Sequence, residues 1–407
     1  VDTFEPDSVT NAGRRIPMLA LHNATACTPG GLLRQAMLLV DDSSHISYVG
    51  PPARFEQRHG RSVDLQGMLL SSGFIDIHTH GGRGITFGQP GRQADDLAQY
   101  SQWVLRSGVT GFICSLAAPD RASLLSIVAE CAEVLEIGLP GAEGLGIHLE
   151  GPFLNPERRG AFSRSWLRQP TLEEATALLE AGRGWIRMVT LAPELPRAGE
   201  VAALFHSVGV TVALGHSDAS YEVASDALQG RWTHVTHTCN AQSPFTHRQP
   251  GVVGAVLTSE RVTAELIADG VHLHAGALKL LNRCLGTERL VLVTDAMAAA
   301  GLGNGEYRLV GELVTVVDGV ARLSDGTLAG STATMDSCLR HWISATGCSP
   351  EVSTRLASTN AARAVGAMSS VGKLVPGKLA NLTVLDQDLR VRLVVVRGKI
   401  VYEAGLA

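Results

Sequence analysis

Residues 69–80 read LLSSGFIDIHTH, an apolar run that predicts a β-strand and ends in a His-Thr-His group. Four more runs, rich in Val, Ile and Leu, are each followed at once by His, Glu or Asp. They are Gly144–Leu149 before Glu150, Val208–Gly215 before His216, Thr233–Thr236 before His237, and Leu290–Thr294 before Asp295. Parallel α/β barrels carry their chemistry at the carboxyl ends of the strands, because the loops that follow surround one mouth. The sequence therefore predicts that these polar side chains meet at one site.

The middle of the chain alternates strand-like and helix-like segments, which is typical of a parallel α/β barrel. Three further runs bring the predicted strands to eight: Val109–Ser115, Ile186–Leu191 and Val262–Ala268. Helices are predicted at Ala94–Arg106, Ala122–Ile137, Leu172–Ala181, Ala198–Ser207, Tyr221–Leu228 and Ala275–Cys284. Residues 301–330 interrupt the alternation and predict an inserted β-hairpin. We therefore expect an α/β fold with a (β/α)8 barrel over residues 68–368.

Both ends of the chain have short strands separated by turns. The predicted strands are Met18–His22, Ala36–Leu39 and Ser47–Val49 near the start, and Leu382–Leu385, Leu393–Val396 and Lys399–Tyr402 near the end. Either set alone is too small to be stable. Residues 1–67 and 369–407 are therefore predicted to form one small β-sandwich domain together.

The residues at the strand ends form a possible metal-ligand set. His78 and His80 flank one residue, and because an extended chain repeats every two residues, both rings face the same side. Imidazole and carboxylate ligands without thiolate suit Zn²⁺, Fe²⁺, Mn²⁺ or Co²⁺. The set offers enough donors for one divalent ion or for a bridged pair, and the sequence does not choose among these metals.

Composition narrows the class of protein. The 407 residues carry 34 Lys and Arg against 39 Asp and Glu, a net charge of −5, with no basic run, so nucleic acid is not an expected partner. No apolar stretch reaches the roughly 18 residues that span a bilayer, and Val1–Arg15 is polar rather than signal-like, so we expect a cytoplasmic protein without membrane association. The seven cysteines include no CxxC pair, which argues against a disulfide framework or a thiolate metal site.

Longer motifs surround the candidate ligands. They are His78-Thr79-His80-Gly81-Gly82, His148-Leu149-Glu150-Gly151-Pro152-Phe153, Gly215-His216-Ser217-Asp218-Ala219, Thr236-His237 with Asn240-Ala241, Asp269-Gly270-Val271-His272, Val293-Thr294-Asp295-Ala296-Met297, Leu328-Ala329-Gly330-Ser331 and Pro376-Gly377-Lys378. In this order they resemble the N-acetylglucosamine-6-phosphate deacetylases of the amidohydrolase superfamily. The His-X-His pair marks the whole superfamily, whereas the Glu-Gly-Pro-Phe, Asp-Gly-Val-His and Leu-Ala-Gly-Ser segments are specific.

The resemblance implies roles for the candidate ligands. Glu150, His216 and His237 match the family's principal metal ligands. His78 and His80 match the pair that lets some members hold a second ion. The aspartate that takes a proton from the attacking water, and returns it to the leaving amine, corresponds to Asp295, which we also count among the metal ligands.

The resemblance also implies contacts with a phosphorylated amino sugar. The Asn240-Ala241 turn and Arg248 match phosphate contacts, and in some members the neighbouring subunit supplies the arginine, so a homodimer with a shared active site is expected. His247 is a candidate phosphate contact or a loop residue without that role. The full set of candidate substrate contacts is Asn240, Ala241, Arg248, His272, His247 and Ala161.

One segment departs from the family pattern. Members commonly show basic-Gly-Ala-His, and that histidine is implicated in polarising the acetyl carbonyl where a single metal is bound; here Phe162 takes its place. Losing one such donor costs about 3–4 kcal/mol of transition-state stabilisation. Either a second ion at His78 and His80 compensates, which we favour, or the substrate sits differently. His148, two residues before Glu150, is expected to support the site rather than bind metal.

We therefore expect metal-dependent hydrolysis of the acetamide of N-acetyl-D-glucosamine 6-phosphate. One alternative keeps the metal and changes the substrate to N-acetylgalactosamine 6-phosphate or another N-acyl amine. A more remote alternative is a metal-free barrel that serves as a binding or assembly scaffold.

Overall fold

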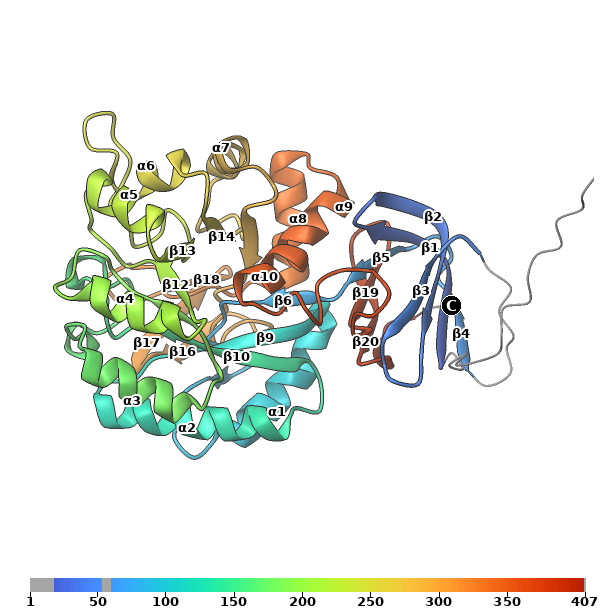
Figure 1. Cartoon of the computed structure of the whole chain (residues 1–407), viewed down its shortest axis with the longest axis horizontal. Helices are drawn as coiled ribbons and strands as arrows, with labels where there is room; N and C mark the ends of the chain where they lie inside the picture. Colours follow the sequence, from blue (N-terminus) through green and yellow to red (C-terminus); the bar gives the residue numbers. More distant parts are fainter. Residues whose placement is uncertain (1–17, 53–59, 406–407) are drawn as a thin grey trace, which may run out of the picture.

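The computed structural model describes residues 18–52 and 60–405, which form two units side by side (Figure 1). The polar segment Val1–Arg15 lies outside the described residues. The larger unit is built on an eight-stranded sheet of parallel strands in the order β15-β14-β13-β12-β11-β10-β9-β6. These strands are β6 (Phe74–Asp76), β9 (Val109–Leu116), β10 (Glu143–Glu150), β11 (Ile186–Thr190), β12 (Thr211–Leu214), β13 (Trp232–Val235), β14 (Thr263–Ile267) and β15 (Leu290–Val293).

Helices follow most of these strands and lie outside the sheet (Figure 1). They are α1 (Gln93–Trp103), α2 (Arg121–Ile137), α3 (Leu172–Gly182), α4 (Ala198–Ser207), α5 (Tyr221–Gln229), α6 (Gly251–Thr258), α7 (Ala275–Leu285), α8 (Met335–Thr346), α9 (Pro350–Leu356) and α10 (Thr359–Ala364). Asp120 and Thr171 cap α2 and α3 by accepting hydrogen bonds from backbone N–H groups in the first turn. The six predicted helices are confirmed; α6, α8, α9 and α10 were not predicted.

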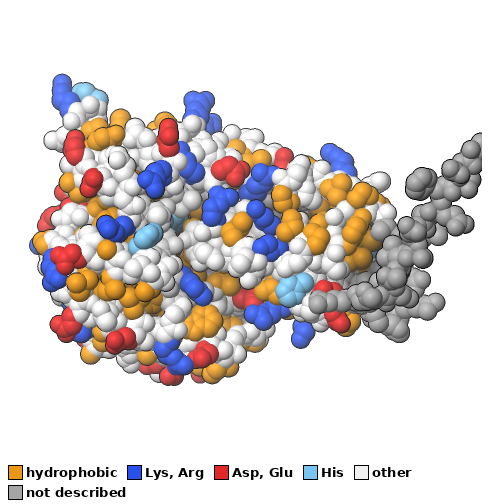
Figure 2. All heavy atoms as spheres, in the orientation of Figure 1, with side chains coloured by type: hydrophobic (Ala, Val, Ile, Leu, Met, Phe, Trp, Pro, Cys, Tyr) orange, Lys and Arg blue, Asp and Glu red, His pale blue; other side chains and the backbone are white. Residues whose placement is uncertain are grey.

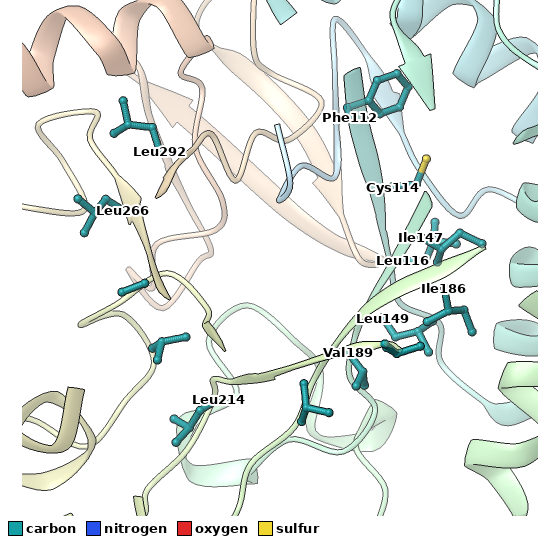
Figure 3. Close-up of a cluster of buried hydrophobic side chains, with 14 of the residues drawn as sticks. Phe112, Cys114, Leu116, Ile147, Leu149, Ile186, Val189, Leu214, Leu266 and Leu292 are labelled. Carbon is teal, nitrogen blue, oxygen red and sulfur yellow. The ribbon is translucent and has the colours of Figure 1, made fainter. Parts of the chain in front are cut away.

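Both faces of the parallel sheet are buried, and alternate residues divide between them. Phe112, Cys114 and Leu116 of β9 point toward the helices, together with Leu149 and Leu292 from other strands (Figure 3). The residues between them belong to a second apolar cluster that contains Ile75, Ile77, Ile113, Met188, Val291 and Val293 and is covered by α10. Two-sided burial explains why these strands read as continuous apolar runs.

The first and last strands of the sheet are joined just beyond their ends. The Asp76 carboxylate accepts hydrogen bonds from the hydroxyl of Thr294 at 2.6 Å and from its backbone N–H at 3.2 Å. Further along, the Asp295 N–H donates to the His78 carbonyl at 2.8 Å, and Thr79 forms a parallel bridge with Ala296. The outer strands are thereby connected on the side where the candidate ligands lie.

The smaller unit is built from strands near the start and near the end of the described residues. Its strands are β1 (Leu19–Thr28), β2 (Gly31–Val40), β3 (Ile46–Gly50), β4 (Arg61–Asp64), β5 (Leu69–Ser72), β19 (Leu382–Leu385), β20 (Val391–Val396) and β21 (Lys399–Glu403). All eight strands belong to one hydrogen-bonded sheet, and its packing as the predicted small β-sandwich stays a prediction. The strand β1 holds this sheet together. It has two register shifts, and it pairs with β4 along its first half and with β5 along its second.

The prediction of a single strand over Leu69–Ile77 is wrong. The chain breaks at Gly73, so that β5 joins the small sheet and β6 the large one. A Cβ at Gly73 would lie 2.1 Å from the Thr110 hydroxyl oxygen, so no side chain fits there. The Gly73 N–H donates instead to the Asn381 carbonyl at 2.8 Å. This short crossing places the His-Thr-His group only a few residues from the joint between the two units.

The predicted insertion is confirmed as antiparallel β-structure. It consists of β16 (Gly305–Leu309), β17 (Glu312–Val317) and β18 (Val320–Arg322), which form a separate three-stranded sheet. A two-stranded ribbon, β7 (Gly81–Gly82) with β8 (Ile85–Thr86), follows the His-Thr-His group.

The surface of the large unit mixes both signs of charge, with Lys and Arg side chains interspersed among Asp and Glu on the face in Figure 2. Among the described residues no helix is both long and apolar enough to cross a membrane.

We predict that Leu70→Ala lowers the free energy of unfolding by about 2–5 kcal/mol, because it opens a cavity in the small sheet. Leu70 is fully buried between Ala26 of β1 and Val384 of β19. Urea denaturation measures the effect, and Leu69→Ala is the matched control because Leu69 is only partly buried. An equal loss in both variants would show that β5 does not hold the small sheet together.

Candidate metal centre and catalytic cavity

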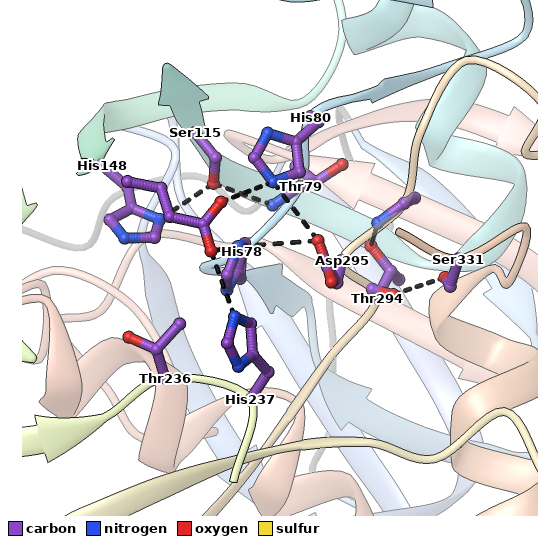
Figure 4. Close-up of polar contacts among 12 residues, drawn as sticks. His78, Thr79, His80, Ser115, His148, Thr236, His237, Thr294, Asp295 and Ser331 are labelled. Atoms are coloured by element: carbon purple, nitrogen blue, oxygen red, sulfur yellow. Dashed lines mark hydrogen bonds and ion pairs between the residues drawn. The ribbon is translucent and has the colours of Figure 1, made fainter. Parts of the chain in front are cut away.

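The six predicted ligands lie at the carboxyl ends of the parallel strands. His78 and His80 follow β6, Glu150 is the last residue of β10, and the others come two residues after β12, β13 and β15. All six are at most 8% exposed. Figure 4 shows His78 and His80, from the segment after β6, pointing toward His237 and Asp295, which follow two other strands. The structure thus brings together every ligand expected from the sequence.

The Glu150 carboxylate is the centre of this cluster. The Nε2 atoms of four histidines lie near its oxygens: His80 at 2.9 Å, His216 at 3.1 Å, His237 at 3.2 Å and His78 at 3.3 Å. The six residues divide into two groups, Glu150 with His216 and His237, and His78 with His80 and Asp295. Within each group the ligand atoms lie within 4.8 Å of one another.

Three of these ligands have an unusual backbone conformation. The φ angles of His216, His237 and Asp295 are 47°, 26° and 48°, in the left-handed region that disfavours side chains with a Cβ. Such conformations cost about 1–3 kcal/mol each and persist only where surrounding contacts enforce them. In each case the chain turns sharply after a strand and directs the side chain toward the other ligands at the carboxyl ends of the strands.

The Asp295 turn is held by the Leu-Ala-Gly-Ser segment. The Ser331 N–H donates to the Asp295 carbonyl at 2.7 Å, and the Ser331 hydroxyl donates to the Thr294 carbonyl at 2.5 Å. A Cβ at Gly330 would lie 3.0 Å from the Asp295 carbonyl oxygen, and its φ is +61°, so glycine suits this position. The specific motif noted in the sequence therefore fixes the aspartate.

Sequence reasoning missed Glu265, which binds two residues of the ligand cluster and one histidine outside it. This fully buried residue of β14 accepts from the Nδ1 of His78 at 2.9 Å, from the Nε2 of His234 at 3.0 Å and from the backbone N–H of His237 at 2.9 Å. Burial opposes its ionised form, but the neighbouring His78 and His234 hold the Glu265 pKa well below its usual range. The available signal was a lone Glu inside an apolar strand.

The hydrogen bonds on the outer ring nitrogens leave ligand atoms free. Because a carboxylate and a carbonyl only accept, His78 donates from Nδ1 to Glu265, and His216 donates from Nδ1 to the Arg158 carbonyl at 2.8 Å. In its neutral form each ring presents an Nε2 lone pair to the centre, and the buried Nε2 of His78 has no hydrogen-bond partner among the described residues. Lone pairs converging with carboxylates fit a divalent cation, so the residues suit the metal that the sequence predicts.

Electrostatics also favour a cation here. Burial opposes protonation of His80, yet hydrogen bonds to Asp295 and Glu150 raise its pKa to about 9. Burial raises the pKa of Asp295, but the charges and hydrogen bonds of His78 and His80 lower it overall. The cluster therefore holds two ionised carboxylates that need positive charge, which a protonated histidine or a metal ion can provide.

His148 has both ring nitrogens in hydrogen bonds, so neither is free to bind a metal ion, as expected. Its Nδ1 pairs with the Ser115 hydroxyl at 2.9 Å and its Nε2 with the Thr190 hydroxyl at 2.8 Å. Burial and the positive charge of His78 lower its pKa to about 3. His148 is thus a neutral, fully buried polar residue beneath Glu150.

A cavity of about 780 Å³ opens onto the cluster. Glu150, His80, His216, His237 and Asp295 line its base. The other predicted contacts that line it are Ala161, Asn240, Ala241 and His272. Its remaining wall comes from the segment after Glu150 and from the inserted strands. A volume of this order is typical of small-molecule sites, and the cavity lies directly over the candidate ligands.

His272 is held in the cavity by a neighbouring acid. Its Nδ1 lies 2.7 Å from the Asp269 carboxylate, which also accepts from the His272 backbone N–H at 2.8 Å. Burial opposes protonation, but Asp269 and Asp295 raise the His272 pKa, while Arg322 acts against them. Within a single chain His247 and Arg248 do not reach this cavity, because both lie on the exposed loop before α6.

Phe162 contributes an apolar wall close to the ligands. Its ring is 5% exposed and meets the His216 ring edge-on, with 5.4 Å between ring centroids. It packs in a cluster with Leu154, Met297 and Leu309. The phenyl ring offers no hydrogen-bond donor at this point of the cavity.

A family model described as "Amidohydrolase family" matches residues 69–401. The chain belongs to the amidohydrolase family. It is 37% identical over 337 residues to an N-acetylglucosamine-6-phosphate deacetylase of Bacillus subtilis, covering 82% of this chain and 85% of that protein. It is 39% identical over 366 residues to the Homo sapiens protein of the same name, covering 87% and 88%.

Two further relatives bear on substrate. An N-acetylgalactosamine-6-phosphate deacetylase of Escherichia coli O157:H7 is 35% identical over 334 residues, covering 82% of this chain and 87% of that protein. The Mycobacterium smegmatis N-acetyl-D-glucosamine-6-phosphate deacetylase, solved as a mutant in complex with N-acetyl-D-glucosamine-6-phosphate, matches with a TM-score of 0.86 and 35% identity, covering 95% of this chain and 99% of that one.

We predict that Glu265→Gln raises the dissociation constant for a divalent metal by about 10–100-fold, because His78 loses the charge that orients it. Competition titration against a chelator measures this constant. Glu288→Gln is the matched control, since Glu288 is exposed and makes only long ion pairs with Arg355 and Arg363. Unchanged metal affinity in a folded Glu265→Gln protein would contradict the role given to Glu265.

Proposed function

We propose that the protein hydrolyses the acetamide of N-acetyl-D-glucosamine 6-phosphate and releases glucosamine 6-phosphate and acetate. The observation that carries this proposal is the buried carboxylate–imidazole cluster at the base of a hexose-sized cavity. Relatives named for this reaction cover most of the chain at 34–39% identity. The reaction belongs to amino sugar metabolism, and we propose that it takes place in the cytoplasm.

A second candidate substrate is N-acetylgalactosamine 6-phosphate. It is favoured by the similarity to the Escherichia coli relative, which is as close as several of the glucosamine-named ones. The two sugars differ only at one hydroxyl, and we rank the gluco epimer first because more of the similar proteins carry that name.

We propose that one or two divalent ions bind at the cluster, with zinc the first choice among Zn, Fe, Mn and Co. Glu150, His216 and His237 would hold the first ion, and His78, His80 and Asp295 the second. When bound, such an ion lowers the pKa of a coordinated water toward about 7 and polarises the acetamide carbonyl.

Phe162 supports the use of both ligand groups. The phenyl ring beside His216 cannot donate a hydrogen bond to the acetamide oxygen. The second group is complete in this chain, with the Nε2 of His80 at 3.3 Å from the Asp295 carboxylate. We therefore propose that two ions are needed.

Asp295 is the proposed acid–base residue. Its lowered pKa means that it is ionised at neutral pH and ready to accept a proton from the attacking water. An amine cannot leave as an anion, so the carboxyl group must then return that proton to the nitrogen as the carbon–nitrogen bond breaks. The hydrogen bonds that fix its backbone keep one carboxylate in position for both steps.

Substrate binding is proposed to use several sides of the cavity. Asn240, Ala241 and His272 would contact the sugar phosphate, and Ala161 also lines the cavity. Arg248 and His247 lie on an exposed loop of their own chain. In a homodimer they would contact the substrate's phosphate in the cavity of the partner subunit.

We propose that the parallel sheet closes into a (β/α)8 barrel. The bridge between Thr79 and Ala296, and the bonds from Thr294 to Asp76, support closure between its first and last strands. We keep the predicted division into a small β domain and a barrel, with the second boundary at residues 368/369. The first boundary, predicted at residues 67/68, moves to Gly73, because β5 belongs to the small sheet.

We predict that Asp295→Asn lowers kcat for acetate release by about 10²–10⁴-fold, because the amide cannot shuttle the proton. Metal content is measured on the same samples so that a lost ligand is not mistaken for lost proton transfer. Asp226→Asn on the exposed face of α5 is the control. Full activity in Asp295→Asn with normal metal content would refute this mechanism.

The substrate proposal predicts that kcat/KM is highest for N-acetylglucosamine 6-phosphate in a panel with N-acetylgalactosamine 6-phosphate and unphosphorylated N-acetylglucosamine. Acetate release is assayed with each of Zn²⁺, Fe²⁺, Mn²⁺ and Co²⁺. Preference for the galacto sugar would select the second candidate, and no turnover with any metal would reject both.

A further inference from the structure

A second cavity, of about 180 Å³, lies at the joint between the two units. It is lined by β1 and β5 of the small sheet, by α9 and α10, and by the segment that follows α10. The helix α9 contacts β5 at this joint (Figure 1). Ser72 lies just before β6 and Glu288 just before β15, whereas candidate metal ligands follow the carboxyl ends of the same strands. This cavity is therefore at the amino ends of the parallel strands, away from the catalytic cavity.

The charge in this second cavity is positive. Among the described residues that line it, three are basic, Arg355, Arg363 and Lys373, and one is acidic, Glu288. Arg355 and Arg363 approach the two oxygens of the Glu288 carboxylate at 3.6 Å and 3.9 Å, which is too long for hydrogen bonds. Lys373 forms no ion pair in the part of the chain that the structure describes. One carboxylate thus faces three cations and does not neutralise them.

Three side chains in this cavity have donors without acceptors. The Ser72 hydroxyl, the Arg355 guanidinium and the Lys373 amine make no hydrogen bond with any other described residue. Ser72 is only 6% exposed, so its hydroxyl is a buried polar group that can find an acceptor only in the cavity. Buried polar groups are nearly always hydrogen-bonded. One ligand with several acceptor oxygens would satisfy all three donors.

The rest of the lining adds no negative charge. Burial raises the pKa of the Cys27 thiol to about 12, so this thiol stays protonated at neutral pH. Arg355 acts on the same thiol electrostatically, which shows that its charge lies near Cys27. The hydroxyls of Thr354 and Ser358 donate to backbone carbonyls at 3.2 Å and 2.7 Å. A polar cavity with surplus cations and no thiolate suits an anion rather than a metal ion.

We propose that this cavity binds a small oxyanion of the phosphate class, either inorganic phosphate or a short phosphate monoester. Phosphate oxygens accept charge-assisted hydrogen bonds from Lys373 and from the guanidinium groups of Arg355 and Arg363, and one further bond from the Ser72 hydroxyl. Because both units line the cavity, the bound anion connects β5 to α9 and α10. The unfolded chain lacks this site, so binding raises the stability of the folded protein. The proposal is independent of the reaction proposed above.

The test measures binding of inorganic phosphate and of glycerol 3-phosphate to the metal-loaded protein, freed of excess metal, by isothermal titration calorimetry. We expect Lys373→Gln, Arg355→Gln and Ser72→Ala each to raise the Kd of one phosphate site about tenfold, because each removes a hydrogen bond to a charged ligand. These side chains make no hydrogen bond to other described residues, so the variants should fold. The rise in Tm caused by phosphate should shrink in the same variants.

The matched control is Lys399→Gln. Lys399 is an exposed residue of β21 in the same small sheet and does not line the cavity. The change removes the same charge as Lys373→Gln, and phosphate affinity should equal that of the wild type.

The two probes distinguish the possible sources of the ligand. Tighter binding of inorganic phosphate would support a site for the free ion, and tighter binding of glycerol 3-phosphate a site for a phosphorylated metabolite. Failure of both probes to bind would overturn the proposal. Equal phosphate affinity in the wild type and in all three cavity variants would also overturn it, because the phosphate would then be bound elsewhere.

Discussion

The structure depends on one buried carboxylate that must be neutralised. Glu150 is 2% exposed, and four histidine Nε2 atoms lie within 3.3 Å of its oxygens. A buried charge without partners costs several kcal/mol, so this cluster is stable only if every ring keeps its orientation and positive charge is supplied at the centre. Parallel strands meet this demand, because their carboxyl ends bring residues from distant parts of the sequence to one place.

The surrounding residues keep this arrangement rigid. Glu265 fixes His78 and the backbone at His237, and the Leu-Ala-Gly-Ser segment fixes Asp295. The left-handed turns at His216, His237 and Asp295 store conformational energy that the packed sheet must supply. Folding therefore supplies the free energy that orients the catalytic groups. No further reorganisation is needed when substrate binds, which is the general advantage of preorganised groups.

The strand-end pattern predicted the six ligands, because an apolar run that stops at a polar residue marks both a buried strand and its end. The same pattern could not reveal the break at Gly73, since the apolar residues continue from one sheet into the other. The contact with Thr110, which leaves no room for a side chain at Gly73, is seen only in the folded structure. Glu265 escaped detection because its partners His78 and His234 are remote in sequence.

Metal binding at the carboxylate–imidazole cluster is tested most directly by a crystal structure of the zinc-loaded protein, with anomalous scattering measured at the zinc edge. We predict an anomalous peak about 2.0–2.2 Å from Glu150, His216 and His237, and a second among His78, His80 and Asp295. A fully ordered cluster with no anomalous peak after zinc loading would contradict the claim, because its carboxylates would then be neutralised by protonated histidines alone.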